Sequence, residues 1–117
     1  MQPLVVPRPM ANPAVADSLS SHDCAKVLKA IADSTRLRIL RHLIGGEKNV
    51  SQLVDEIKAD QPSISHHLSL LRHAKLVMES REGKNVYYRI NPAVARHLSS
   101  EMEKIDLGCC SVELRKE

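Results

Sequence analysis

The sequence predicts a mainly α-helical protein that carries one β-hairpin. Apolar residues recur at helical spacing through most of residues 18–73, which favours a series of amphipathic helices. Residues with strong β preference then gather at 77–80 and 86–90, on either side of the turn-forming stretch 81–85. Aromatic residues make up only 2% of the chain, so its core must be aliphatic, as is typical of packed helices.

The first half of the chain divides into an arm and two helices. Residues 1–17 are rich in proline and lack periodicity, which predicts a flexible N-terminal arm. A first helix is expected from about Ser18–Ser21 to Asp33, with Leu19, Val27, Leu28 and Ile31 as its apolar stripe. Asp33 or Ser34 would cap a second helix, which Gly45 and Gly46 end.

Three further helices and a hairpin complete the predicted domain, residues 18–107. The third helix is expected at 50–59, and Asp60 and Gln61 form a turn, with Pro62 at the first position of the fourth helix. After the hairpin, Val94, Leu98, Met102 and Ile105 have near-heptad spacing, which predicts a last helix suited to packing against a partner. Residues 108–117 are predicted to be a cysteine-containing C-terminal tail.

Length and composition restrict the class of protein. A chain of 117 residues forms one domain, and a thin aliphatic core favours gaining burial by dimerisation. No apolar run approaches the roughly 18 residues that a membrane span needs, and the N-terminus lacks the layout of a signal peptide. Three cysteines, an odd number, do not form a disulfide framework, so a cytoplasmic protein is expected.

Two helices joined by a short turn and followed by a hairpin are typical of a DNA-binding module. The second helix of this pair would lie in the major groove, and its N-terminal half carries short polar side chains that can reach base edges. Residues 61–90 contain five basic and two acidic residues, whereas residues 47–60 contain two basic and four acidic residues, so the positive charge gathers on the second helix and the hairpin. The predicted DNA-binding residues are Gln61, Ser63, Ser65, His66, His67 and Arg72 on the helix, and Arg81 and Lys84 on the hairpin.

Two other classes compete with this prediction. An enzyme is not expected, because the sequence shows no nucleophile–base–orienter set, no glycine-rich phosphate loop and no HExxH helix. A winged-helix module that binds another protein instead of DNA remains an alternative. The polar face of the fourth helix and the basic residues of the hairpin argue against this alternative. Salt-dependent binding to promoter DNA would distinguish a DNA-binding module from a protein-binding one.

The stretch 28–90 resembles the ArsR/SmtB family of small dimeric winged-helix repressors. The resemblance rests on the run 32–40 (ADSTRLRIL), on Ile64–Leu68 (ISHHL) followed by Leu71, and on the hairpin residues 81–84 (REGK) with 86–88 (VYY). It implies a winged helix-turn-helix homodimer built by the first and last helices, an operator with two half-sites, and repression that a ligand releases.

The chain departs from two sensing sites of that family. The arsenic/cadmium type has a Cys-x-Cys pair at the start of the third helix, where this sequence reads Asn49-Val50-Ser51-Gln52 without a thiol. The zinc type uses acid and histidine ligands on the last helix, and the aligned positions hold Pro92, Val94, Ile105 and Gly108. Neither site can form as the family has it.

The remaining thiols are Cys24, near the start of the first helix, and Cys109 and Cys110, after the last. If these helices meet at the dimer interface, as the resemblance implies, the three thiols are expected to form a metal site, either within one protomer or across two. Three thiolates suit As(III) or Sb(III), and thiolate-rich sites also suit Zn(II), Cd(II) or Cu(I). Redox sensing is the alternative function of Cys109 and Cys110. Cys24 also fits a small apolar residue buried on its helix. His22 and His97 are possible additional ligands, although each fits a solvated polar residue better.

Overall fold

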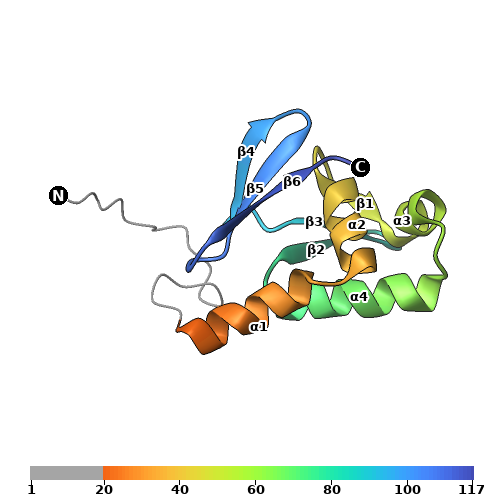
Figure 1. Cartoon of the computed structure of the whole chain (residues 1–117). Helices are drawn as coiled ribbons and strands as arrows, with labels where there is room; N and C mark the ends of the chain where they lie inside the picture. Colours follow the sequence, from red (N-terminus) through yellow and green to blue (C-terminus); the bar gives the residue numbers. More distant parts are fainter. Residues whose placement is uncertain (1–19) are drawn as a thin grey trace.

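The computed structural model describes residues 20–117, so the predicted N-terminal arm lies outside the described residues. Figure 1 shows how the elements are arranged: the helices lie in the first part of the chain, with the short strand β1 between α2 and α3, and the later strands complete two antiparallel sheets. The elements are α1 (Ser21–Ile31), α2 (Ser34–Leu43), β1 (Lys48–Asn49), α3 (Val50–Ile57), α4 (Gln61–His73), β2 (Val77–Glu82), β3 (Asn85–Ile90), β4 (Ala95–Ser99), β5 (Met102–Asp106) and β6 (Ser111–Arg115). The predicted winged helix-turn-helix fold is confirmed.

Short polar residues set where each helix begins. The Ser20 side chain accepts a hydrogen bond from the amide of Asp23, and Asp33 caps α2 through the amides of Thr35 and Arg36. Asn49 and Gln52 form a reciprocal capping box on α3. Asp60 caps α4 through the amide of Ser63, so Gln61 takes the first helical position and Pro62 the second, one position later than predicted.

The helices pack around an aliphatic core, as the low aromatic content predicts. Ile64, Leu68 and Leu71 form the buried stripe of α4, and each has an exposed fraction of 0%. They belong to one cluster with buried residues from every other helix and from both sheets. This stripe sets which face of α4 remains available to a ligand, because the residues between its members must point outward.

The wing is a hairpin of β2 and β3 in a three-stranded sheet. β3 is the central strand, paired with β2 from Val77↔Ile90 to Glu82↔Asn85 and with the short strand β1 on its other side. Gly83 and Lys84 form the turn, and Gly83 has a φ of 63°, a conformation that glycine adopts without strain. Pairing therefore extends closer to the tip than the sequence predicts, and it brings Arg81 into β2.

The prediction of a last helix over Val94–Ile105 is wrong. The chain there forms β4 and β5, which join β6 in a second antiparallel sheet of order β4-β5-β6. Glu103, Ile105 and Leu107 are buried at alternate positions, so this stretch has a period of two residues, which places its apolar residues on one face of a strand. The near-heptad spacing of Val94, Leu98, Met102 and Ile105 predicted a helical period, which this stretch does not have.

The stretch predicted as a C-terminal tail contains the third strand of this sheet. β6 pairs with β5 over Met102↔Arg115 to Asp106↔Ser111, and Leu114 is buried. Arg41 of α2 fastens the end of β6, since its Nε donates to the carbonyl oxygen of Arg115 at 2.9 Å and its guanidinium lies 3.2 Å from the Glu117 carboxylate. In residues 20–117, no helix is long and apolar enough to cross a membrane.

Candidate DNA-binding surface and thiol cluster

The outer face of α4 presents most of the predicted DNA-contacting side chains to solvent. Gln61, Ser65, His66 and Arg72 are exposed, and they alternate with the buried stripe of the same helix. The Arg72 guanidinium lies 3.9 Å from the Glu79 carboxylate in β2, with 44% of its side chain exposed. A phosphate can therefore compete for Arg72, because an exposed ion pair at that distance is weak.

Two predicted contact residues of α4 are less accessible than the others. Ser63 is half-buried, and its amide donates to the carboxylate that caps the helix. His67 has only 18% of its side chain exposed, and its Nδ1 lies 3.8 Å from a carboxylate oxygen of Asp33 at the start of α2. The imidazole of His67 therefore faces the contact between α2 and α4 as much as solvent, a placement that its helix position alone did not indicate.

The two predicted wing residues are exposed on the hairpin. Lys84 lies in its two-residue turn, and Arg81 is in β2, paired with Val86 across the hairpin. Behind them, the hydroxyl of Tyr88 donates to Glu79 at 3.1 Å. Burial raises the pKa of Tyr88, and the Glu79 carboxylate adds to that effect, so this hydroxyl stays protonated and keeps donating. The wing thus presents two cations on a braced hairpin.

Asp33 links the start of α2 to α4, and its removal should weaken both. The hydrogen bond from the Arg36 amide holds the pKa of Asp33 below its usual value of 3.8, and the nearby His67 acts in the same direction, although burial opposes them. We expect Asp33→Ala to lower the free energy of unfolding by about 0.5–2 kcal/mol, the usual value of a helix cap. Urea titration measures it, with exposed Asp55→Ala as the control.

The pH dependence of this effect has a defined sign. Because folding lowers the pKa of Asp33, its contribution is present above the unfolded value and is lost as the pH falls through the lower, folded value. The stability difference between the protein and Asp33→Ala should therefore shrink in acid. A difference that grows as the pH falls below 4 would contradict this account.

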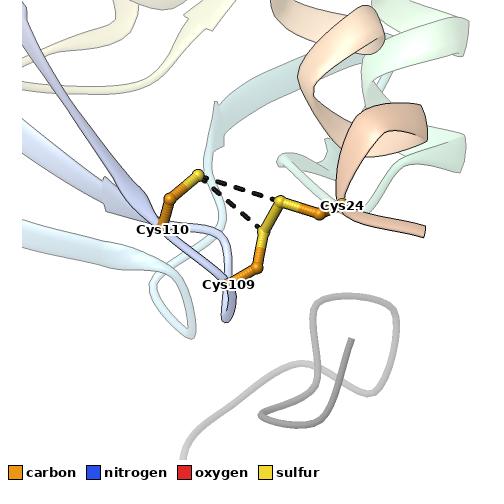
Figure 2. Close-up of side chains that lie close together, drawn as sticks. All are labelled: Cys24, Cys109 and Cys110. Carbon is orange, nitrogen blue, oxygen red and sulfur yellow. Dashed lines mark hydrogen bonds between the residues drawn. A yellow bond between two sulfur atoms is a disulfide. The ribbon is translucent and has the colours of Figure 1, made fainter. Parts of the chain in front are cut away.

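The three cysteines meet at one place, as predicted. Cys24 comes from the first turn of α1, and Cys109 and Cys110 come from the turn between β5 and β6; Figure 2 shows the three side chains converging. Their sulfur atoms all lie within 4.8 Å of one another, although 85 residues separate Cys24 from Cys109. Cys24 is half-buried, and the other two are exposed.

Within this thiol cluster (Cys24, Cys109 and Cys110), two sulfurs are bonded and the third is free. Cys24 and Cys109 form a disulfide with a Cα–Cα distance of 6.0 Å. The Cys110 sulfur lies 3.9 Å from that of Cys24 and 3.8 Å from that of Cys109 (Figure 2). Each pair of sulfurs is thus close, and α1 is joined to the second sheet at this point.

Local backbone contacts hold the two adjacent cysteines in position. The amide of Leu107 donates to the carbonyl oxygen of Cys110 at 2.8 Å, which closes the turn, and the Asp106 carboxylate accepts from the amide of Gly108 at 2.9 Å. Gly108 has a φ of 95°, which favours glycine. The thiols are therefore carried on a defined turn between paired strands, and not on a free tail.

The two histidines considered as additional ligands are not in the cluster. Within the described residues, the group of possible metal ligands at this place consists of the three cysteines alone. His97 lies in β4, 69% exposed, with its Nδ1 3.9 Å from the Glu103 carboxylate. His22 is exposed on α1.

The cluster has an apolar border that was not predicted from the sequence. Leu28 was predicted to belong to the core stripe of α1, but it is 38% exposed. Together with Ala25, it lines the same hollow as Cys24 and Cys109. Its spacing of four residues from Cys24 on one helix was the available signal, because such residues share a face.

Comparison with known proteins identifies the family. The transcriptional repressor SdpR of Bacillus subtilis is 40% identical over 68 residues, which cover 58% of this chain and 76% of SdpR. The family model described as "Bacterial regulatory protein, arsR family" matches residues 33–79, from the cap of α2 into β2. The chain belongs to the arsR family.

Two other similar proteins support the same assignment. The arsenical resistance operon repressor of Escherichia coli K12 is 40% identical over 70 residues, which cover 59% of this chain and 60% of that repressor. The solved structure of reduced HlyU from Vibrio cholerae superposes with a TM-score of 0.58 at 34% identity, covering 61% of this chain and 75% of that one. This arsR-family protein is a transcriptional regulator and not an enzyme.

Proposed function

We propose that this protein is a cytoplasmic homodimeric repressor that binds operator DNA through α4 and the wing. We further propose that a thiophilic ion bound by Cys24, Cys109 and Cys110 releases it. As(III) or Sb(III) is the favoured inducer, and Zn(II) or Cd(II) the next. The observation that carries the proposal is the meeting of three sulfurs within 4.8 Å, on a regulator of this family.

The DNA-binding part of the proposal rests on the exposed face of α4. Gln61, Ser65 and His66 supply donors and acceptors near the N-terminus of α4, where the second helix of such a motif reads base edges. Arg81 and Lys84 extend the cationic surface along the wing, where they meet phosphates or the minor groove. In this arrangement His67 contributes mainly by holding α4 against the start of α2.

Two substitutions test the assignment of roles on this surface. Ser65→Ala should relax sequence preference and lose about 1–3 kcal/mol of operator-binding free energy if it removes a base contact. Lys84→Ala should weaken binding to all sequences alike and reduce the slope of log affinity against log salt by about one. Fluorescence anisotropy with operator and unrelated duplexes measures both, and Lys116→Ala, after β6, is the control. Unchanged affinity in both variants would show that DNA binds elsewhere.

The inducer part rests on the chemistry of the donor set. Three thiolates match a soft trigonal centre such as As(III), and relatives of this chain include two arsenical resistance operon repressors. When bound, such an ion would replace the Cys24–Cys109 bond by sulfur–ion bonds to all three residues, so the protein must be reduced first. The half-buried Cys24 anchors the site, and the exposed pair on the β5–β6 turn gives access from solvent.

We propose that the site acts through the dimer. In the absence of a last helix, α1 is the remaining element of the expected interface, and Ala25 and Leu28 give it an exposed apolar face beside the cluster. A ligand that holds α1 against the β5–β6 turn favours one arrangement of α1. This changes the separation of the two α4 helices, which must match half-sites about 34–36 Å apart. Coupling requires this preference, because equal affinity for both states shifts nothing.

Leu28→Glu tests the dimer. The carboxylate would be buried against the partner's α1, so we expect a monomer at micromolar concentration and loss of operator binding, both measured directly by analytical ultracentrifugation and anisotropy. Leu98→Glu, at a residue of β4 that is 45% exposed, is the matched control. Leu98 was predicted to lie on the dimer-forming last helix, so a monomer produced by the control and not by Leu28→Glu would move the interface to the second sheet.

A further inference from the structure

We infer that oxidation is a second input to the same site: a peroxide closes a disulfide between α1 and the β5–β6 turn, and the closed form excludes the metalloid. This inference rests on the proposed function, because it assigns a competing state to the proposed inducer site. It also assigns a role to each sulfur: Cys24 is one end of the disulfide in every case, and either Cys109 or Cys110 is the other end.

The geometry shows why the two inputs exclude each other. The Cys24–Cys109 bond takes two sulfurs out of the set of three, and Cys110 is left as the one free thiol of the cluster. A single thiolate cannot complete a three-coordinate site for As(III). The same side chains therefore either bind the ion or bond to each other.

The oxidation step balances with a peroxide as the oxidant. One thiolate attacks an oxygen of hydrogen peroxide, the O–O bond breaks, and the sulfur becomes a sulfenic acid while hydroxide leaves. A second thiolate then attacks that sulfur, the S–O bond breaks, and the S–S bond forms. Two electrons pass from the sulfurs to the peroxide, and its oxygens leave as two waters after taking up protons.

Cys110 makes the closed form exchangeable. Its sulfur lies 3.9 Å from that of Cys24, so the Cys110 thiolate can attack Cys24, form a new bond and release Cys109 as a thiolate. No oxidant is consumed, and the link between α1 and the turn persists with either partner. Loss of one of the adjacent cysteines should therefore spare the oxidative link, whereas loss of Cys24 should abolish it.

The disulfide should also lower operator affinity. It joins the first turn of α1 to the β5–β6 turn, the same two elements that a three-thiolate ligand would hold together. The oxidised protein thus adopts the released arrangement without any ion. Coupling of this kind typically corresponds to about 5–150-fold in affinity, and reduction should restore it.

The experiment uses the full chain, reduced with a phosphine, desalted without oxygen, and then divided. One portion receives hydrogen peroxide, peptide mapping without reductant locates the disulfide, and both portions are assayed for arsenite retention and for operator binding. Cys24→Ser, Cys109→Ser, Cys110→Ser and the double variant Cys109→Ser/Cys110→Ser are treated in parallel. We expect the link in both single variants of the turn, and its loss in Cys24→Ser and in the double variant.

The outcomes separate this inference from the proposed function. We expect the reduced protein to retain arsenite, and the oxidised protein to retain none and to bind the operator about 5–150-fold more weakly. If both forms retain arsenite, or the oxidised form binds the operator as tightly as the reduced form, the oxidative input is overturned while the inducer site stands. A disulfide found only between Cys109 and Cys110 also overturns it. Failure of the reduced protein to bind arsenite overturns the inducer site, and the exclusion with it.

Discussion

The Cys109→Ser/Cys110→Ser variant will bind operator DNA as tightly as the unmodified protein, but it will not release the DNA when arsenite is added. Both substitutions lie on the exposed β5–β6 turn and not on α4 or the wing, so the proposed DNA-binding surface should stay intact. With one thiol left, the site loses its three-coordinate character. Arsenite should lower the operator affinity of the reduced, unmodified protein by about 5–150-fold. The double variant should show no such change.

Anisotropy with labelled operator, titrated with arsenite under reducing conditions, measures this prediction. Ser111→Ala, the next position along the chain and also exposed, is the matched control and should respond normally. Cys24→Ser determines the third ligand, because an intact response in that variant would leave the adjacent pair acting alone. If the double variant responds like the unmodified protein to every thiophilic ion and to peroxide, the sensor lies elsewhere.

Leu68→Ala will destabilise the protein far more than Leu70→Ala, two positions along the same helix. Leu68 has an exposed fraction of 0% in the central stripe of α4, so its truncation leaves a cavity and should cost about 2–5 kcal/mol of unfolding free energy. Leu70 is 37% exposed on the other side of the helix, and its truncation should change stability by about 0.5 kcal/mol or less.

Urea denaturation followed by circular dichroism measures both variants. Both substitutions replace leucine by alanine in the same helix, so they remove the same atoms and change helix propensity equally. The difference between the two variants therefore reports the burial of the side chain. A comparable loss in both variants would mean that α4 does not present one face to the core and the other to solvent. The DNA-binding assignment depends on that arrangement.

The sequence by itself was sufficient for the four helices α1–α4 and for the wing. Each of these depends on local information: the caps Asp33 and Asp60, the helical spacing of Ile64, Leu68 and Leu71, and the turn at Gly83. Period and cap chemistry are properties of neighbouring residues, so they can be seen without the fold. The meeting of the thiols was also predicted, although on the incorrect premise of two interface helices.

Only the tertiary structure decided the C-terminal part and the geometry of the cluster. Val94, Leu98, Met102 and Ile105 fit a helix in sequence, but Glu103, Ile105 and Leu107 are buried in the second sheet, where pairing of β5 with β4 and β6 satisfies the backbone. These pairs join neighbouring strands, but the burial that favours strand over helix here comes from packing against helices that are distant in the chain. The same long-range packing brings Cys109 to Cys24 across 85 residues, and it turns His67 toward Asp33.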